Sequence, residues 1–217
     1  MRINANDSIV GDCAVLVPYC LKHVQKYHGW MGSEELRRET CSEALTLEEE
    51  EQMQRAWRDD PDKLTFIILD RRTMERSGGD EIASMVGDIN AFLCSGQIMD
   101  FVGEEWNITE GDGRLDGRRC FELSVMLAEP GFRRRGIALE ACKLMIAYIL
   151  QCIGESIFVA KIGAGNQPSL ALFRNRLSFS DCAFSEVFES ITLRLDFQQA
   201  KELLKNVQLR IESYSQS

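Results

Sequence analysis

The fold prediction starts from residues 121–162, whose sequence is FELSVMLAEPGFRRRGIALEACKLMIAYILQCIGESIFVAKI. Residues 121–127 and 157–162 are rich in branched and aromatic side chains and predict two strands. Residues 137–150 predict a helix in which only Glu140 and Lys143 are charged, so it must be buried on more than one side. A strand, a helix and a strand in about 40 residues predict a βαβ unit with a parallel strand pair and a right-handed crossover.

The connection from the first strand to this helix, residues 129–138, reads Glu-Pro-Gly-Phe-Arg-Arg-Arg-Gly-Ile-Ala. A helix N-terminus exposes unpaired N–H groups and a partial positive charge. Gly136 and Ala138 leave room for a ligand to approach the backbone. The turn therefore predicts an anion-binding site suited to a pyrophosphate, with three arginines that could bind further phosphates. The alternative is a structural turn whose arginines form a solvated surface.

Two other phosphate-binding classes are disfavoured by their missing motifs. The chain has no Gly-x-x-x-x-Gly-Lys-Ser/Thr, so a P-loop NTPase is not indicated. It also lacks Gly-x-Gly-x-x-Gly, and Gly163-Ala164-Gly165 has no third glycine, so a Rossmann dinucleotide site is weakly supported.

The rest of the chain predicts further strands and helices. Strands are expected at 15–18, 65–69 and 85–93, and helices at 21–31 and 47–58, the second with Thr46 as N-cap. Residues 70–84 read as a turn or loose loop within a hairpin, and residues 95–118 as an insertion or mobile loop. Downstream we expect a helix at 167–177, a strand at 191–195 that closes the sheet, and a charged helix at 197–211.

Composition limits the class of protein. The chain has 217 residues, 45% of them hydrophobic and 27% charged, which predicts one large domain or at most two small ones with a sizeable core. The net charge of 25 − 34 = −9 argues against a nucleic-acid partner and against an anionic membrane surface. The chain contains no apolar run of about 18 residues, so we expect no transmembrane helix. The first residues do not read as a secretory peptide.

Cysteine and histidine usage predicts a reducing, cytoplasmic location and no metal site. The eight cysteines are scattered without a Cys-x-x-Cys and mostly lie in apolar runs, which is typical of buried free thiols. The two histidines, His23 and His28, are five residues apart, a poor spacing for two ligands on one helix face.

Residues 33–62 are strongly acidic. They contain eleven acids and four arginines, a local net charge of 4 − 11 = −7. Such a run is typical of a solvated helical face, and its functional alternative is a rim that attracts a cationic partner.

The motif Arg133-x-x-Gly136-x-Ala138, preceded by Glu129-Pro130, resembles the acetyl-CoA motif of the GCN5-related N-acetyltransferase (GNAT) superfamily, Gln/Arg-x-x-Gly-x-Gly/Ala. Further segments, among them 27–36, 85–88 and 160–163, resemble its N-acetyltransferase 9 group, described as acetylating tubulin N-termini. The resemblance covers most of residues 1–196. It implies an α/β fold in which a mostly antiparallel sheet contains one splayed parallel strand pair and is flanked by helices. We accordingly expect a GNAT domain at 1–196, with 95–118 inserted, and a C-terminal helical extension at 197–217.

The same resemblance implies an acetyl-CoA site. The pantetheine arm of the co-substrate would lie between the splayed strands and pair with backbone groups of Met126, Leu127 and Ala128. Asn166 would contact the arm or shape its exit. The pyrophosphate would be held by the amides of Arg133, Arg134, Arg135, Gly136, Ile137 and Ala138.

Glu122 lies at the strand position that often carries the general base in this superfamily. By simple alternation it shares a face with Cys120, Ser124 and Met126, opposite a more apolar face. Its alternative role is a structural ion pair. The backbone amide near Leu127 would stabilise the oxyanion.

The position at which the superfamily often has a tyrosine as general acid holds Phe173 here. Phenylalanine cannot donate a proton, so Phe173 reads as a core residue and the Ser169 hydroxyl as a weak substitute. The spacing from Asn166 to Phe179 is also one residue longer than the usual pattern, which leaves the register after Phe173 open.

The function that follows is an acetyl-CoA-dependent protein N-acetyltransferase. An α-amine has a pKa of about 8 against about 10.4 for lysine, so far more of it is neutral and able to attack a thioester near pH 7. This favours a protein N-terminus as acceptor, and the resemblance implies tubulin. The alternatives are a non-catalytic GNAT-fold module that binds tubulin or microtubules, and an acetyltransferase of lysine or of a small polyamine.

Overall fold

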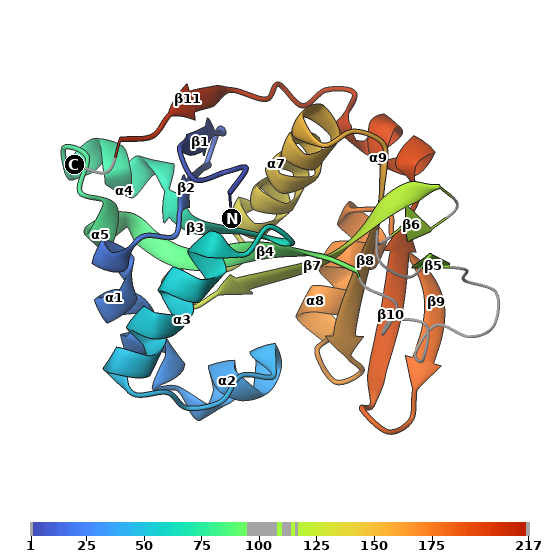
Figure 1. The fold of residues 1–217 in the computed structure, drawn as a ribbon, viewed down its shortest axis with the longest axis horizontal. Coiled ribbons are helices and arrows are strands. Elements are labelled where there is room, and N and C mark those ends of the chain that lie inside the picture. The colour runs from blue at the N-terminus through green and yellow to red at the C-terminus, as the bar shows by residue number, and fades with distance from the viewer. Residues whose placement is uncertain (1, 95–107, 110–113, 116, 216–217) are drawn as a thin grey trace. The chain divides into compact units, whose positions relative to one another are not determined.

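The computed structural model describes residues 2–94, 108–109, 114–115 and 117–215. The chain divides into two compact units (Figure 1). Unit 1 comprises residues 1–90, 125–141 and 209–217, and unit 2 comprises residues 91–124 and 142–208. The boundaries fall inside β4 (Met85–Leu93), β7 (Arg118–Leu127) and α7 (Ile137–Cys152), so these three elements contribute residues to both units.

The strands of unit 1 are hydrogen-bonded in the order β11-β1-β2-β3-β4-β7. Those not yet given are β1 (Asp7–Val10), β2 (Ala14–Pro18), β3 (Lys63–Asp70) and β11 (Ile211–Ser213). The pairs β1–β11, β1–β2 and β2–β3 are antiparallel. The strands predicted at 15–18, 65–69 and 85–93 are confirmed.

The helices of unit 1 are mostly short. They are α1 (Leu21–Met31), α2 (Glu34–Thr40), α3 (Leu47–Asp59), α4 (Arg71–Arg76), α5 (Glu81–Ser84) and the 3-10 turn η2 (Pro130–Phe132). α1 and α3 pack side by side (Figure 1). Thr46 is the N-cap of α3, as predicted, and forms a capping box with Glu49.

The core of unit 1 joins α1 to one face of its strands. Val17, Ile67 and Met85 come from three neighbouring strands and share a buried cluster with Val24 and other α1 side chains. All eight residues of β3 are buried, so the opposite face is covered as well.

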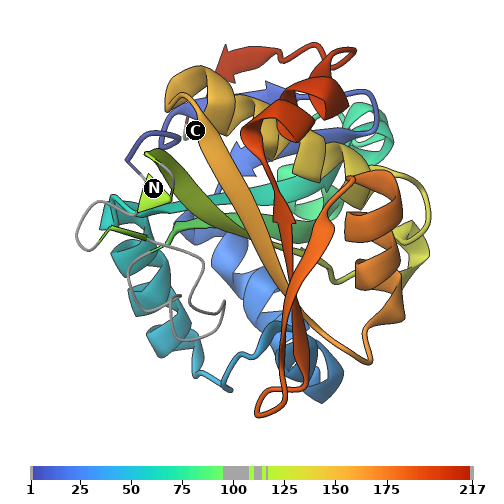
Figure 2. The ribbon, with the colours of Figure 1, turned by 90° about the vertical axis from the view of Figure 1, so that its right-hand side faces the viewer.

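The strands of unit 2 are hydrogen-bonded in the order β7-β8-β10-β9, with β6 also paired to β7 (Figure 2). The additional strands are β5 (Ile108–Thr109), β6 (Arg114–Leu115), β8 (Ser156–Gly163), β9 (Ser180–Ser185) and β10 (Ser190–Leu195). β7 and β8 are parallel, whereas β8–β10, β9–β10, β5–β6 and β6–β7 are antiparallel. The prediction of a mostly antiparallel arrangement with one parallel pair is confirmed.

The helices of unit 2 are the main part of α7, α8 (Gln167–Ala171), the π-helical turn η3 (Leu172–Arg176) and α9 (Phe197–Leu204). The prediction that α7 is buried on several sides is confirmed, since its buried side chains occupy most positions from Ala141 to Ile149. The buried side chains of α7 are Ile137, Ala141, Cys142, Leu144, Met145, Ile146, Tyr148 and Ile149.

The loop prediction for 70–84 is wrong, because this segment contains α4 and α5. The carboxylate of Asp70 accepts a hydrogen bond from the Thr73 amide at 2.8 Å, and that of Asp80 from the Ala83 amide at 2.9 Å. Each aspartate therefore caps a short helix. Gly78 and Gly79, both with positive φ, separate the two helices.

The prediction of a helix through residue 211 is also wrong, because α9 ends at Leu204 and Ile211 begins β11. Residues 207–212 alternate strictly between apolar and polar side chains, which is the period of a strand. The strand at 191–195 does not close the sheet either, because β9 lies beyond β10. The domain boundary at residue 196 stays a prediction.

Within the predicted insertion at 95–118, the described residues contain the short β5–β6 pair and the start of β7. The rest of that prediction lies outside the described residues. Four of the eight cysteines are buried, as predicted, but Cys41, Cys152 and Cys182 are exposed. Among the described residues, no helix is long and apolar enough to cross a membrane.

Candidate active site

The end of β7 is held against β4 in unit 1. The amide of Ala128 donates to the Val86 carbonyl at 2.9 Å, and that of Glu129 donates to the same oxygen at 3.3 Å. Because successive residues of a strand direct their backbone groups to opposite edges, the amide and carbonyl of Leu127 face away from β4. Of the three residues expected to pair with the pantetheine arm, Ala128 has its amide bonded to β4 and so cannot donate it to the arm. Leu127 directs its amide to the opposite edge of β7.

Gly87 on β4 makes this close approach possible. A Cβ atom at this position would lie 1.9 Å from the carbonyl oxygen of Met126, and the obstacle is backbone rather than a flexible side chain. An isolated glycine within a strand pattern is the sequence signal for such an approach.

The start of the turn after β7 is fixed by side chains of α1. The indole Nε1 of Trp30 donates to Glu129 Oε1 at 2.8 Å, and Lys26 Nζ lies 3.9 Å from the same atom. Burial lowers the pKa of Lys26, although the charge of Glu129 acts in the opposite direction. Glu129 is thereby oriented by two residues of one helix, and η2 follows directly.

The turn itself has an unusual backbone. Arg134 and Gly136 both have positive φ, 62° and 85°, with Arg135 between them in the ordinary region. The Gly136 carbonyl accepts the first helical hydrogen bond of α7, from Glu140 at 2.9 Å. Such an alternation of backbone conformation directs successive N–H groups to one side and forms an anion-binding concavity.

The amides of this turn are available to a ligand. No described residue accepts a hydrogen bond from the amides of Arg134, Arg135, Gly136, Ile137 or Ala138. These five amides are enough donors for a diphosphate. They lie at the N-terminus of a sixteen-residue helix, whose dipole favours an anion. Of the amides predicted for the pyrophosphate, that of Arg133 is not available, because it donates to the Pro130 carbonyl at 3.2 Å. The role of the other five stays a prediction.

The three arginines are exposed and have different environments. Arg133 Nε donates to the Leu127 carbonyl at 3.1 Å, and the Arg135 guanidinium lies 5.0 Å from the centre of the Phe132 ring. Arg134 contributes the left-handed backbone conformation described above. Only Arg133 therefore has a hydrogen bond that ties it to the end of β7.

In unit 2, Glu122 pairs with a lysine on the neighbouring strand. Lys161 Nζ lies 3.1 Å from Glu122 Oε2, and the two side chains are 28% and 27% exposed. The parallel pairing of β7 with β8 runs from Arg119–Ser156 to Glu122–Val159 and ends there. The burial along β7 does not separate a polar face from an apolar one as simple alternation predicts. Ser124 is half-buried, but Cys120 and Met126 on the same expected face are buried, and Val125 and Leu127 opposite are half-buried.

Asn166 has a structural role in unit 2. Its Oδ1 accepts the Ser169 amide at 3.1 Å and caps α8, and its own amide donates to the Gly163 carbonyl at 2.9 Å. These bonds fix the orientation of the side chain and leave its NH₂ group for a ligand.

Phe173 is a core residue, as predicted. It is 2% exposed and packs edge-on against Phe179, with ring centres 5.1 Å apart. It belongs to the π-turn η3, in which the Leu177 amide donates to the Leu172 carbonyl at 3.1 Å. A π-turn holds one more residue than an α-helical turn, which accounts for the longer spacing from Asn166 to Phe179.

Residues 14–175 match the family model described as "Acetyltransferase (GNAT) domain". The chain belongs to the GNAT acetyltransferase family. The resemblance drawn from the turn motif is therefore confirmed, and the chain is an acetyltransferase.

Relatives within the GNAT family are similar along most of their length. The chain is 41% identical to the human protein named "Alpha/beta-tubulin-N-acetyltransferase 9" over 203 residues, which cover 93% of this chain and 88% of that protein. It is 39% identical to the "N-acetyltransferase 9-like protein" of Nematostella vectensis over 207 residues, which cover 95% and 94%.

Solved structures share the GNAT fold at low identity. A GNAT-family acetyltransferase from Bacillus anthracis has a TM-score of 0.63 at 12% identity and covers 88% of this chain and 99% of its own. A spermidine N-acetyltransferase from Vibrio cholerae, solved with CoA and spermine, has a TM-score of 0.62 at 11% identity and covers 88% and 99%.

Sequence reasoning missed two groups with a direct role in this geometry. Lys161 was not expected as the partner of Glu122, although a lysine within the otherwise apolar strand at 157–162 is a signal of a paired charge. Gly87 was not expected to position β7, although an isolated strand glycine indicates a close backbone approach.

Proposed function

We propose that this GNAT acetyltransferase transfers the acetyl group of acetyl-CoA to the N-terminal α-amine of a protein, and that tubulin is the acceptor. The turn at the head of α7, with its unused amides and left-handed Gly136, supports acetyl-CoA as the donor. The names of the relatives that are about 40% identical over nearly the whole chain support tubulin as the acceptor.

The amides from Arg134 to Ala138 would bind the pyrophosphate of acetyl-CoA, and exposed Arg134 and Arg135 would add positive charge. The amide of Leu127, directed away from β4, would serve the pantetheine arm or the oxyanion. Acetyl-CoA supplies an activated acetyl group. Residues of this chain would bind and orient it and accept the proton of the amine.

In the transfer, the amine nitrogen forms a bond to the acetyl carbon and the carbon–sulfur bond breaks. The amine loses a proton, for which Glu122 is the proposed acceptor, directly or through a water molecule. A thiolate leaves with the electron pair of the broken bond. Because a thiol has a pKa of about 8.5, this leaving group needs little help from an acid, which accommodates a phenylalanine at position 173.

An α-amine suits a carboxylate base better than lysine does. Its pKa of about 8 leaves a substantial neutral fraction near pH 7.4, whereas lysine, at about 10.4, has almost none.

A tubulin acceptor and eight cysteines without a disulfide among them support a cytoplasmic location.

The experiment is transfer of labelled acetyl from acetyl-CoA to synthetic peptides that carry tubulin N-termini. We expect label on the α-amine, and no label on the same peptide with a blocked N-terminus and a free internal lysine. Spermine in a parallel reaction tests a polyamine acceptor. Label on the blocked peptide or on spermine, with none on the free N-termini, would overturn the proposed acceptor.

The role of Glu122 is tested with a matched pair of variants. If Glu122 is the base, Glu122→Gln lowers kcat by about 10²- to 10⁴-fold, while the affinity for acetyl-CoA is unchanged. Lys161→Gln breaks the same ion pair from the other side and keeps the carboxylate. An equal loss of kcat in both variants would show instead that Glu122 acts through the ion pair alone.

A further inference from the structure

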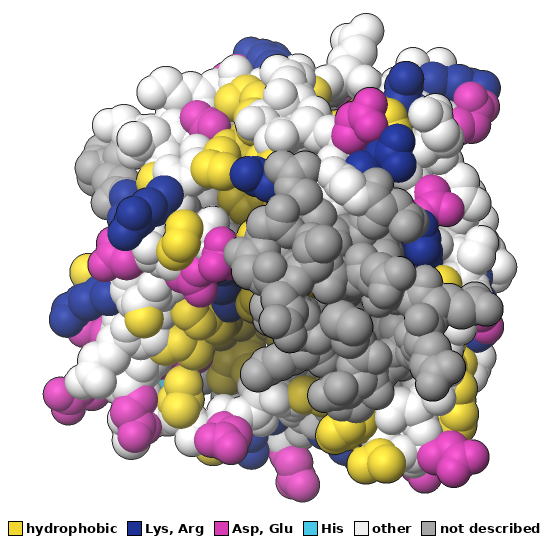
Figure 3. Space-filling model, turned by 45° about the vertical axis from the view of Figure 1, so that its right-hand side comes forward, with side chains coloured by type: hydrophobic (Ala, Val, Ile, Leu, Met, Phe, Trp, Pro, Cys, Tyr) yellow, Lys and Arg dark blue, Asp and Glu magenta, His cyan; other side chains and the backbone are white. Residues whose placement is uncertain are grey.

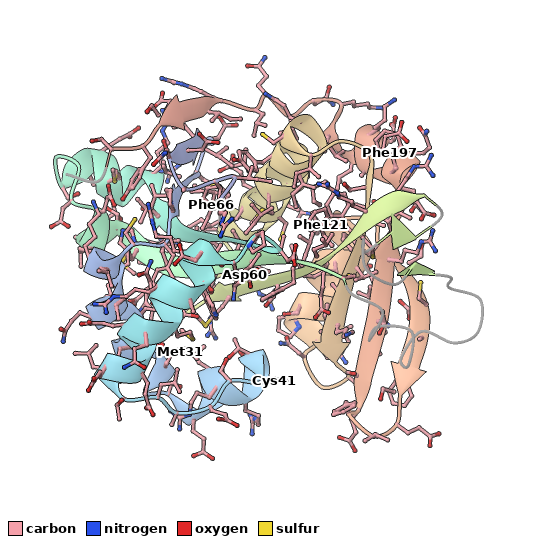
Figure 4. The ribbon with its side chains drawn as sticks, viewed as in Figure 1. Met31, Cys41, Asp60, Phe66, Phe121 and Phe197 are labelled. Atoms are coloured by element: carbon pink, nitrogen blue, oxygen red, sulfur yellow. The ribbon has the colours of Figure 1, made fainter. Side chains whose placement is uncertain are left out.

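Unit 1 contains a cavity of about 160 Å³ that the function described so far does not use. It lies between α1, α3 and the segment that joins α2 to α3, in the region of Met31 and Cys41 (Figure 4). Its volume is on the order of that which accommodates one benzene-sized group. The lining residues are Tyr27, Met31, Ser42, Glu43, Leu45, Glu50, Met53 and Trp57.

The lining combines apolar walls with two carboxylates. Two methionines, a leucine and two aromatic rings supply the apolar surface, whereas Glu43 lies exposed at the rim. The side chain of Glu50 is only 2% exposed, and its Oε2 lies 2.9 Å from His28 Nδ1. A buried carboxylate is costly unless it is paired, and the second oxygen of Glu50 has no partner among the described residues.

This combination favours a particular kind of ligand. Lysine and arginine have an aliphatic stem that packs on apolar surface and a cationic end that binds carboxylates or the face of an aromatic ring. The surrounding residues 33–62 carry a net charge of −7, which raises the local concentration of cations. A purely apolar side chain would leave Glu50 buried without a new partner.

The cavity is connected to the end of β7 through the core. Tyr27 and Met31 belong to the same buried cluster as Met126 and Ala128, and Met53 and Trp57 pack against that cluster. Residues that line the cavity and residues at the end of β7 therefore belong to one core cluster of unit 1. A peptide held in this cavity would contact the helices α1 and α3 and also the connecting segment that carries Glu43.

We propose that this cavity binds the side chain of a lysine or arginine close to the N-terminus of the acceptor peptide. The inference rests on the proposed function in one respect, namely that the acceptor is a peptide. It adds a specificity-determining subsite, in which Glu50 and Glu43 select the cation and the methionines and Trp57 hold its stem.

The test is a set of pentapeptides with free N-termini that carry arginine at each of positions 1 to 4, each matched to the same peptide with norleucine there. At one position, arginine should lower KM roughly tenfold relative to norleucine with little change in kcat, the size expected of a charge-assisted hydrogen bond. Equal KM values at all four positions, or a preference for norleucine, would overturn the proposal.

Three variants locate the effect. Glu43→Gln and Glu50→Gln should each reduce the arginine preference, whereas Glu48→Gln, an equal change of charge at an exposed position of α3 outside the cavity, should not. Melting temperatures show whether Glu50→Gln is folded, and Glu43→Gln carries the test if it is not. An arginine preference that survives both lining variants would contradict the assignment.

A binding measurement separates this proposal from the transfer reaction. Fluorescence anisotropy of labelled, N-acetylated versions of the same peptides reports binding without turnover. Tighter binding of the arginine peptide, lost in Glu43→Gln, would support the cavity even if no peptide were acetylated. Efficient acetylation with no arginine preference in either assay would reject the cavity and leave the proposed function standing.

Discussion

At the scale of single residues, backbone conformation at a few positions shapes the donor site. Gly136 occupies φ 85° and Arg134 φ 62°, and the amides between Arg134 and Ala138 have no described acceptor. Gly87 allows the Met126 carbonyl to approach β4 closely. At these positions the backbone conformation and the backbone amides form the site. Side-chain chemistry alone therefore identifies few of them.

Gly87→Ala tests the close approach. The added Cβ would lie 1.9 Å from the Met126 oxygen, so β4 or β7 must shift. We expect a loss of about 3 kcal/mol in the free energy of unfolding, measured by urea denaturation. Gly131→Ala, where an added Cβ has no neighbour within 4 Å, is the control and should change stability by less than about 0.5 kcal/mol. Equal stabilities of the two variants would contradict the geometry.

At the scale of elements, the π-turn η3 decides where the aromatic side chains after Asn166 point. The extra residue of the turn is absorbed between Leu172 and Leu177, and Phe173 packs on Phe179. A longer spacing that puts the register in doubt at the level of sequence is therefore resolved locally. The residue at the usual tyrosine position belongs to the core.

Phe173→Tyr tests this assignment. If position 173 were a general-acid position, the new hydroxyl would raise kcat. Because the side chain is 2% exposed, we expect no gain in kcat and a loss of about 1–3 kcal/mol in stability from an unsatisfied buried hydroxyl. A rise in kcat with unchanged stability would show that the position faces the reaction.

Prediction from sequence succeeded where the hydrophobic pattern was strong. The strands at 65–69 and 157–162 and the helix α7 are nearly continuous apolar runs that are buried on more than one side, and their lengths distinguish strand from helix. The strand at 121–127 is recognisable by its branched and aromatic side chains. α4 and α5 were missed because six- and four-residue helices carry little period and are set by the caps Asp70 and Asp80. β9 was missed because it is polar and largely exposed.

The candidate site was predictable in its donor half and less so elsewhere. The turn 133–138 has a motif that resembles a known family, whereas the cavity at Glu50 depends on residues from α1 and α3 that are far apart in sequence. Such a juxtaposition is a product of packing, and no spacing within the chain encodes it.

At the scale of the whole molecule, acidic side chains are spread over the face drawn in Figure 3, in keeping with the net charge of −9. In unit 1 the chain's last described residues return to its first ones. β11 pairs with β1, and the Tyr214 hydroxyl donates to Glu81 Oε2 at 2.9 Å. The same carboxylate oxygen lies 3.1 Å from His23 Nε2 and 3.3 Å from Lys22 Nζ.

This cluster predicts a pH dependence of stability. Burial would raise the pKa of Glu81, but the hydrogen bonds from His23 and Tyr214 and the charge of Lys22 outweigh it and lower the pKa to about 2 from a usual 4.5. A depressed carboxylate pKa stabilises the fold above pH 4.5, and this stability is lost as the pH falls from 4.5 towards 2.

Denaturation at a series of pH values measures the effect. Wild type should lose stability more steeply between pH 4.5 and pH 2 than Glu81→Gln, which is less stable at pH 7. Glu75→Gln, whose carboxylate pairs with Arg71 on the surface, serves as a control for the loss of one charge. Identical pH profiles of wild type and Glu81→Gln would exclude the predicted linkage.

If the backbone amides at the head of α7 bind the diphosphate of acetyl-CoA, isothermal titration with acetyl-CoA will show it. Gly136→Glu should abolish measurable binding, because the carboxylate would repel the phosphates. Gly136→Ala places the same backbone strain at φ 85° without the charge and should retain binding. Acetyl-CoA that binds Gly136→Glu as tightly as it binds Gly136→Ala would contradict this role of the amides.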